Sequence, residues 1–150
     1  MISVQHEDFH VQSLYETLLK RNKTGAVAMF VGLVRQFADL PEDACSFELE
    51  HYPGMTEHNL QAIVEEANAR WALLDVCVVH RVGRLSVNDQ IVFVGVSASH
   101  RAEAFQACDF MMDYLKSRAA FWKKETQGEK SHWVEANIKD ESRLARWSET

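Results

Sequence analysis

The chain has 150 residues, of which 47% are hydrophobic and 25% are charged. This length predicts one domain spanning residues 1–150, and the composition is that of an ordinary globular protein rather than a disordered or collagen-like one. The formal net charge of −6 argues against a general nucleic-acid binder or a membrane-surface binder, because such proteins are usually basic.

Several features indicate a cytoplasmic protein. The chain opens with no secretory signal, and its longest apolar run is about half the ~20 residues that span a bilayer. The cysteines, Cys45, Cys77 and Cys108, are odd in number and far apart. This pattern favours a reducing compartment over a disulfide framework.

The N-terminal part is predicted to form a strand, a helix and a second strand. Residues 2–5 alternate weakly and indicate an edge strand, and residues 10–20 have apolar positions at helical spacing. Residues 25–34 are continuously apolar and predict a buried strand. The polar residues 36–44, which follow, are expected to form a loop.

The middle of the chain predicts a helix between strands. Residues 45–52 alternate, which indicates a half-buried strand, and Thr56 is expected to cap the next helix. Further strands are predicted at residues 76–82 and 91–97. The apolar face of the helix is formed by Leu60, Ile63, Val64, Ala67 and Trp71.

The C-terminal part predicts a long helix, a hairpin and a last helix. Ser99 is expected to cap a helix over residues 100–118, and residues 121–126 and 131–136 are expected to pair around a turn at Gln127-Gly128. A short helix is expected at residues 140–147. The apolar stripe expected on the long helix consists of Phe105, Cys108, Met112 and Leu115.

This mixed order of strands and helices predicts an α+β fold. The expected architecture is a mixed or antiparallel sheet with helices on one face and a small antiparallel β-hairpin.

The first candidate site is a basic segment. Residues 114–124 include Lys116, Arg118, Lys123 and Lys124 and no acidic residue, in an otherwise acidic chain. Such a segment fits a small anionic ligand or an acidic partner. The alternative, cations that complement a helix dipole or solvate a hairpin, is more common. Crowded lysines also lower each other's pKa, which favours acid–base or nucleophilic chemistry.

Two further candidates are anion sites. His100 and Arg101 follow a buried strand at the start of a helix, where free N–H groups attract anions; an ordinary capped helix start is equally consistent with this pattern. Arg35 ends another strand, where its guanidinium suits a phosphate. Considered alone, Arg35 is better explained as a solvated charge at a strand end.

The sequence predicts no metal site. The three cysteines lack metal-ligand spacing, and His51 and His80 lie in predicted strands, where a hydrogen-bonded structural histidine is usual. No dinucleotide, P-loop or hydrolase-elbow motif is present.

Several segments together resemble one protein family. They are residues 49–55 (LEHYPGM), 92–101 (VFVGVSASHR) and 112–125 (MDYLKSRAAFWKKE), with shorter matches at 25–27 and 32–35. The family is the large, catalytic subunit of molybdopterin synthase. Because several motifs occur in the same order, the resemblance is specific.

The resemblance implies a sulfurtransferase of molybdenum cofactor biosynthesis. Such an enzyme converts cyclic pyranopterin monophosphate to molybdopterin by installing the dithiolene sulfurs. It needs no cofactor, because a small ubiquitin-like subunit brings the sulfur as a thiocarboxylate on its C-terminal Gly-Gly tail. The large subunit is expected to form a homodimer at the centre of a heterotetramer. Its fold is expected to be an α/β hammerhead with a small antiparallel element.

The resemblance also assigns residues. Lys116 and Lys123 fall on the family's active-site lysines, and Arg35, His100 and Arg101 fall on its substrate-binding residues. The neighbouring substrate-lining positions are Leu33, Val34, Lys124 and Glu125.

The chain departs from the family pattern at two positions. Ala120 replaces a usual proline, so the position of Lys123 relative to Lys116 is less sharply defined. Asn137 stands where some members have an arginine, so a pocket contact from this position is not expected.

Two other functions remain open. A non-catalytic module that binds the C-terminal tail of a ubiquitin-like protein would use the same basic groove. A phosphate-ester enzyme of another type would use Arg35, His100 and Arg101, although the chain lacks an acidic metal-binding cluster.

Overall fold

The computed structural model describes residues 1–36, 45–127, 130–133 and 138–148. In chain order these residues form β1 (Ile2–Gln5), α1 (Val11–Leu18), β2 (Ala26–Leu33), β3 (Cys45–His51), α2 (Met55–Arg70), β4 (Asp75–Arg81), β5 (Gly83–Leu85), β6 (Gln90–Ala98), α3 (Arg101–Arg118), β7 (Phe121–Gln127), β8 (Lys130–Trp133) and α4 (Ile138–Ser148). The expected segments are present within a few residues of their predicted bounds. The short strand β5 was not predicted.

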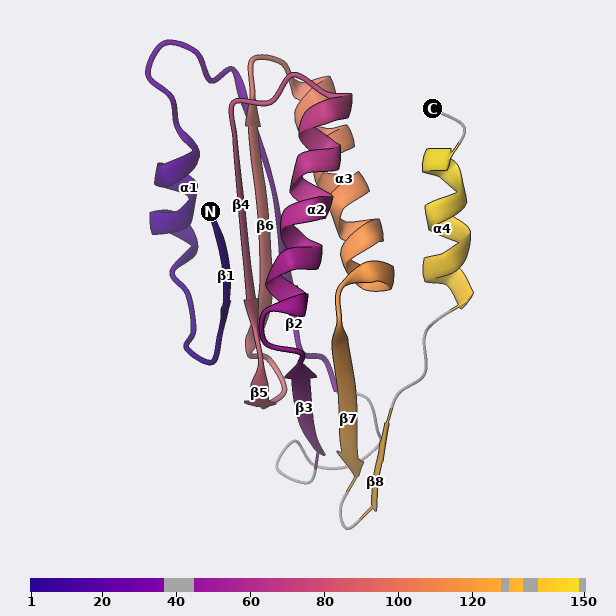
Figure 1. The fold of residues 1–150 in the computed structure, drawn as a ribbon. Helices are drawn as coiled ribbons and strands as arrows, with labels where there is room; N and C mark the ends of the chain where they lie inside the picture. The colour runs from indigo at the N-terminus through magenta and orange to yellow at the C-terminus, as the bar shows by residue number, and fades with distance from the viewer. Residues whose placement is uncertain (37–44, 128–129, 134–137, 149–150) are drawn as a thin grey trace.

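The strands form two sheets. The first has the order β1-β4-β6-β2, in which β1 pairs parallel with β4 and the other neighbours pair antiparallel. The second has the order β5-β3-β7-β8 and is antiparallel throughout. Figure 1 shows β3, β7 and β8 extending beyond one end of the first sheet, with β7 continuing on from α3. The predicted α+β fold with a mixed sheet and an antiparallel hairpin is confirmed.

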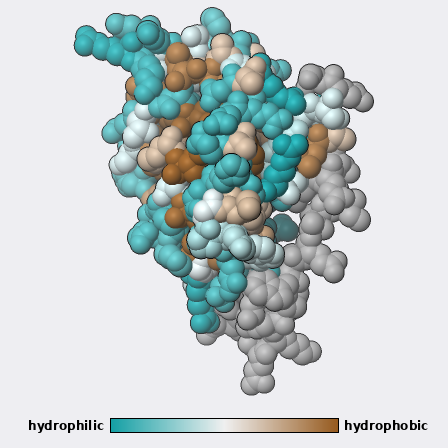
Figure 2. All heavy atoms as spheres, viewed as in Figure 1, coloured by the Kyte–Doolittle hydropathy of each residue, from teal (hydrophilic) through white to brown (hydrophobic). Residues whose placement is uncertain are grey.

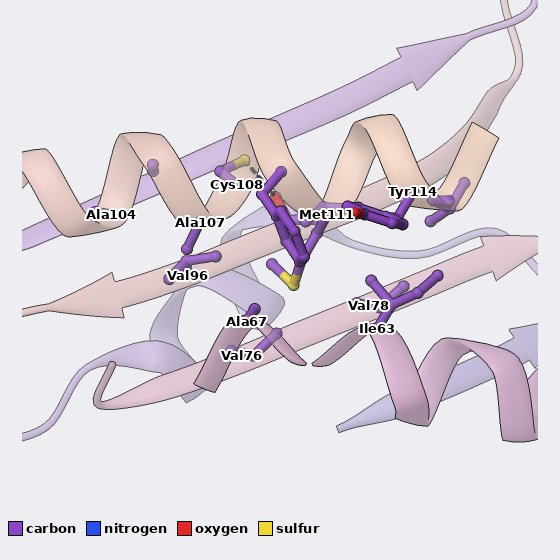
Figure 3. Packing of buried hydrophobic residues seen from close by; sticks show 14 of the residues in the cluster. Ile63, Ala67, Val76, Val78, Val96, Ala104, Ala107, Cys108, Met111 and Tyr114 are labelled. Atoms are coloured by element: carbon purple, nitrogen blue, oxygen red, sulfur yellow. Dashed lines mark hydrogen bonds between the residues drawn. The ribbon is translucent and has the colours of Figure 1, made fainter. Parts of the chain in front are cut away.

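The main core lies between the first sheet and two helices. Side chains of α3, α2, β4 and β6 converge there, among them Met111 and Val96, as Figure 3 shows. A smaller cluster on the opposite face includes Leu18 of α1 and Phe93 of β6, both 0% exposed. The expectation of helices on one face therefore holds for α2 and α3, whereas α1 covers the other face.

Strand β2 is an edge strand rather than an inner one. Among the described strands it pairs only with β6, and Met29, Phe30 and Leu33 are 44%, 40% and 58% exposed. The expectation that residues 25–34 are buried is therefore wrong for these side chains. A continuous apolar run shows that a strand has two apolar faces, but not whether a second strand covers its edge.

Both expected helix caps are displaced. The N-cap of α2 is Gly54, whose N–H donates to the Glu57 carboxylate, and the N-cap of α3 is His100 rather than Ser99. Thr56 is instead buried: its hydroxyl accepts the Tyr52 N–H at 3.0 Å and donates to the Ala120 carbonyl at 2.8 Å.

The buried face of α3 differs in part from the expected stripe. Cys108 and Leu115 are buried as expected, but Phe105 is 67% exposed, and the largest buried side chains are Phe110, Met111 and Tyr114. One further buried residue, Asp113, is an acid that accepts hydrogen bonds from Arg143, Arg146 and Trp147 of α4. Burial raises the pKa of the Asp113 carboxyl, but these hydrogen bonds outweigh that effect and lower it. The carboxylate is therefore charged at neutral pH and holds α4 against α3.

The turn between α3 and β7 is fixed by side chains of α2. Besides the Thr56 bond to Ala120, the Asn59 side-chain amide donates to the Arg118 carbonyl at 3.1 Å. These two bonds hold the backbone between Lys116 and Lys123, although position 120 is alanine rather than proline. The position of Lys123 relative to Lys116 is therefore restrained without a proline at position 120.

Candidate active site

Lys116 and Lys123 lie on either side of the turn between α3 and β7. Lys116 belongs to the exposed last turn of α3, and Lys123, on β7, is half-buried. Both lysines, together with His51, lower the pKa of the same buried side chain, His80. The structure therefore brings the two predicted catalytic lysines to one place, the junction of the two sheets.

His80 is the side chain around which this junction is organised. It lies on β4, is 6% exposed, and stacks on Phe121 of β7 with ring centroids 4.0 Å apart. Burial is the main cause that lowers its pKa to about 4. Its ring is therefore neutral at physiological pH, beside two lysines. The sequence places His80 in a predicted strand, where a structural histidine is usual, and no spacing in the sequence connects it with the lysines.

Lys123 extends from a defined face of the second sheet. Alternate strand residues share a face, so Lys123 and Phe121 lie on the same side of β7. Their register partners on β3 are Leu49 and His51. Leu49 is 1% exposed and belongs to a cluster that also contains Val34. The apolar cluster that contains Leu49 and Val34 therefore lies beside Lys123 and reaches the end of β2.

An open pocket of about 210 Å³ adjoins this face. Its lining includes His6, Leu49, His51 and Gly83. Gly83 has φ +90°, and an added Cβ there would lie 2.6 Å from Nδ1 of His6, so both its backbone and its surroundings require glycine. The pocket meets the lysine junction at His51.

The predicted substrate-lining segment after β2 lies at this same end of the first sheet. Val34 is buried; its N–H donates to the Asp89 carbonyl at 2.9 Å and its carbonyl accepts the Asn88 N–H at 2.6 Å. Leu33 and Arg35, on either side of it, are exposed. The anchored backbone of Val34 therefore presents Arg35 to solvent beside the junction.

His100 and Arg101 do not join this site within one chain. They lie at the start of α3, whereas Lys116 lies in its last turn, as Figure 1 shows. At about 1.5 Å per residue, the helix separates Arg101 from Lys116 by about 22 Å. The two groups therefore lie at opposite ends of α3, and the assignment of His100 and Arg101 to substrate binding stays a prediction.

The other residues of the basic segment differ in role. Arg118 forms an ion pair with Glu66 at 3.0 Å and lies over the Tyr114 ring, so its charge stabilises the packing of α2 and α3. Lys124 and Glu125 pair with Glu48 and Phe47 in the register of β7 and β3. The side chains of Lys124 and Glu125, the whole of Asn137, and residues 37–44 of the predicted loop lie outside the described residues.

The two cysteine side chains that the structure describes do not provide a reactive sulfur; the side chain of Cys45 lies outside that description. Cys77 and Cys108 are free and buried, and burial raises both pKa values, that of Cys108 to about 11. A thiol with a raised pKa is protonated at neutral pH and is a poor nucleophile. Among the described residues there is also no group of three His, Cys, Asp or Glu side chains placed to hold a metal ion, and no helix long and apolar enough to cross a membrane.

Comparisons with known proteins give the family. The family model described as "MoaE protein" matches residues 4–118. A molybdopterin synthase catalytic subunit from Pasteurella multocida is 51% identical over 97% of each chain. The chain belongs to the MoaE protein family. Among solved structures, the MoaE protein from Burkholderia ambifaria has a TM-score of 0.83 and 51% identity, covering 98% of this chain and 97% of that one.

A more distant solved structure has the same fold. Molybdopterin synthase from Staphylococcus aureus is 30% identical, with a TM-score of 0.80 over 88% of this chain and 95% of that chain. The MoaE family model ends at Arg118 and so includes Arg35, His100, Arg101 and Lys116. Lys123 lies beyond it, within the nearly full-length match to the Pasteurella relative.

Proposed function

We propose that this chain is the catalytic subunit of molybdopterin synthase. It converts cyclic pyranopterin monophosphate to molybdopterin, with sulfur from the thiocarboxylated Gly-Gly tail of a small ubiquitin-like subunit. One observation carries the proposal. In this member of the MoaE family, Lys116 and Lys123 both lie near the buried ring of His80, and both lower its pKa. The buried, protonated Cys77 and Cys108 thiols support an external source of sulfur, and free thiols also fit a cytoplasmic location.

Each group has a role that suits its surroundings. Lys116, at the exposed end of α3, exchanges protons with the substrate and the tail as acid and base. Lys123, supported by the apolar cluster below it, stabilises the phosphate and the developing oxyanion. Arg35 binds the substrate phosphate through its planar guanidinium. In each transfer the thiocarboxylate sulfur attacks a carbon of the substrate side chain and displaces an oxygen substituent. Water then hydrolyses the resulting thioester, so the sulfur stays on the pterin and the tail returns as a carboxylate. The cyclic phosphate opens, with its oxygen as the leaving group, as the second sulfur is added. No other cofactor is needed.

A second copy of the chain completes the site. On the face seen in Figure 2, hydrophilic side chains predominate, with hydrophobic atoms showing between them. On β2 and α3, in contrast, exposed Met29, Phe30 and Phe105 surround an apolar groove of about 280 Å³. In the part of the chain that the structure describes, β2 also has one unpaired edge, and such edges are commonly covered by a partner. A homodimer through this surface buries both features.

Two-fold symmetry would bring His100 and Arg101 of one copy near the lysines of the other copy. Two β2 strands that pair antiparallel about Met29 and Phe30 place the start of one strand beside the end of the other. The start of β2 pairs with Ala98, next to His100, and its end leads to Arg35. His100 and Arg101 of one copy therefore approach the lysine junction of the second copy. With one small subunit at each junction, the assembly is a heterotetramer.

Mixing two inactive variants tests this shared site. We expect Lys116→Ala and Arg101→Ala to lose most activity alone, because each damages both sites of its own dimer. After random reassortment, about a quarter of all sites are intact if Lys116 and Arg101 come from different copies. We therefore expect the mixture to recover about a quarter of the wild-type activity. If both residues act within one chain, no site is repaired and the mixture stays inactive.

Binding of the small subunit tests the proposed partner. We expect the chain to co-purify with a small protein that ends in Gly-Gly, since the junction between Lys116 and Lys123 is basic and open. Deleting the two glycines removes the tail from the site and should weaken binding at least about 10-fold, as measured by calorimetry. Failure to bind the intact small subunit contradicts the proposal, and equal binding of the shortened one places the contact outside this junction.

A further inference from the structure

The ring of His80 connects the two sheets below the lysines. It lies on β4 of the first sheet, where its register partners are Val4 and Val92, and it stacks on Phe121 of the second sheet. The planes are inclined by 24° with centroids 4.0 Å apart. Since His80 is 6% exposed, its ring has little room to change orientation.

A hydrogen bond fixes the rotation and the tautomer of this ring. Nδ1 lies 2.9 Å from the Arg81 carbonyl oxygen, and a carbonyl only accepts, so Nδ1 carries the hydrogen. The low pKa caused by burial keeps the ring neutral. Nε2 therefore has a lone pair and no charge, and the ring adds no cation next to Lys116 and Lys123.

Phe121 connects His80 to the strand that carries Lys123. It is the first residue of β7, and Lys123 extends from the same face two residues later. On the other side of the turn, α3 ends with Lys116 in its last turn. A rotation of β7 about its first residue therefore changes the separation of the two lysines. The α2 bonds hold the turn backbone, whereas the stack on His80 holds the face of β7.

We propose that His80 is a positioning residue for sulfur transfer: its fixed ring holds Phe121, and through Phe121 it sets where Lys123 lies relative to Lys116. The proposal rests on the proposed function for its kinetic consequence, although the geometry does not depend on the reaction. His80 itself is not expected to touch the substrate.

Two substitutions separate the ring stack from other contributions. His80→Ala removes the stack, so we expect kcat to fall about 10-fold or more, because small misplacements of reacting groups are costly. The KM for the pterin and the Kd for the small subunit should change less than about 3-fold, since no binding contact is lost. His80→Phe keeps a flat ring on Phe121 and should restore kcat to within about 3-fold of the wild type.

A matched core variant serves as the control for destabilisation. Val79 is the neighbouring residue of β4, is 1% exposed, and packs in the cluster on the α1 side, away from Phe121. Val79→Ala should lower Tm and leave kcat nearly unchanged. Wild-type kcat in His80→Ala overturns the proposal. So does a kcat loss in Val79→Ala as large as in His80→Ala, or a failure of His80→Phe to restore activity.

Chemical labelling tests the positioning without the reaction. We expect the labelling rate of Lys123 by acetic anhydride, followed residue by residue by mass spectrometry, to change at least about 3-fold in His80→Ala and to return in His80→Phe. Lys23, an exposed lysine before β2, is the internal reference. An unchanged Lys123 rate overturns the positioning role, even if the chain makes no molybdopterin. A changed rate in a protein without activity contradicts only the proposed function.

Discussion

Lys116→Ala is expected to abolish molybdopterin formation while binding of the small subunit is nearly unchanged. Loss of a positioned acid–base group costs about 10²- to 10⁴-fold in rate. Lys116 is exposed at the end of α3 and makes no contribution to the core, so the fold should be unaffected. Single-turnover product formation with thiocarboxylated small subunit measures the chemical step, and calorimetry measures binding.

Arg118→Ala is the matched control for this variant. Arg118 is also a cation in the last turn of α3, but it is paired with Glu66. Its removal should cost at most about 1 kcal/mol of stability and little of the rate, because exposed ion pairs are weak. Normal turnover in Lys116→Ala rejects the acid–base assignment. An equal rate loss in both variants indicates that only the total charge of the helix end matters.

Lys123→Ala is expected to be the second most damaging change. Removing one group that stabilises developing charge typically costs about 10²- to 10³-fold in kcat. Lys123 is half-buried beside the neutral His80 ring, so its ammonium acts where solvent screens it less than at the surface. The same single-turnover assay gives the loss, and the KM for the pterin should also rise because the phosphate loses a contact.

The neighbouring Lys124 provides a charge-matched comparison. Lys124→Ala removes the same charge one residue further along β7, and we expect it to cost less than about 5-fold, because Lys123, which is assigned to the phosphate and the oxyanion, is still present. Losses of equal size at the two positions contradict the assignment of Lys123 and show that the wrong lysine has been chosen.

Much of the fold follows from local patterns. The alternation of Phe47, Leu49 and His51 indicated the buried face of β3, and the aromatic and lysine residues from Phe121 onward indicated the hairpin. The basic segment with Lys116 and Lys123 was identified from charge alone, and the family resemblance assigned its roles. These features are local, so the sequence displays them directly.

The remaining features depend on contacts between distant segments. Whether residues 25–34 form an inner or an edge strand depends on sheet order, which no local pattern contains. His80 and Phe121 stack on each other because the two sheets meet at this point. The contact depends on how the sheets are placed, which the local sequence does not contain. The separation of Arg101 from Lys116 follows from an unbroken α3, which places the two motifs at opposite ends of one helix.

The most direct test of the central claim is sulfur transfer by the purified chain. With cyclic pyranopterin monophosphate and thiocarboxylated small subunit, we expect mass spectrometry to detect a pterin that has gained two sulfur atoms, with two small subunits returned to the carboxylate form. Small subunit that already carries an ordinary carboxylate should give no product. If the thiocarboxylated subunit binds and no sulfur reaches the pterin, the chain is a tail-binding module rather than the synthase, and the central claim is wrong.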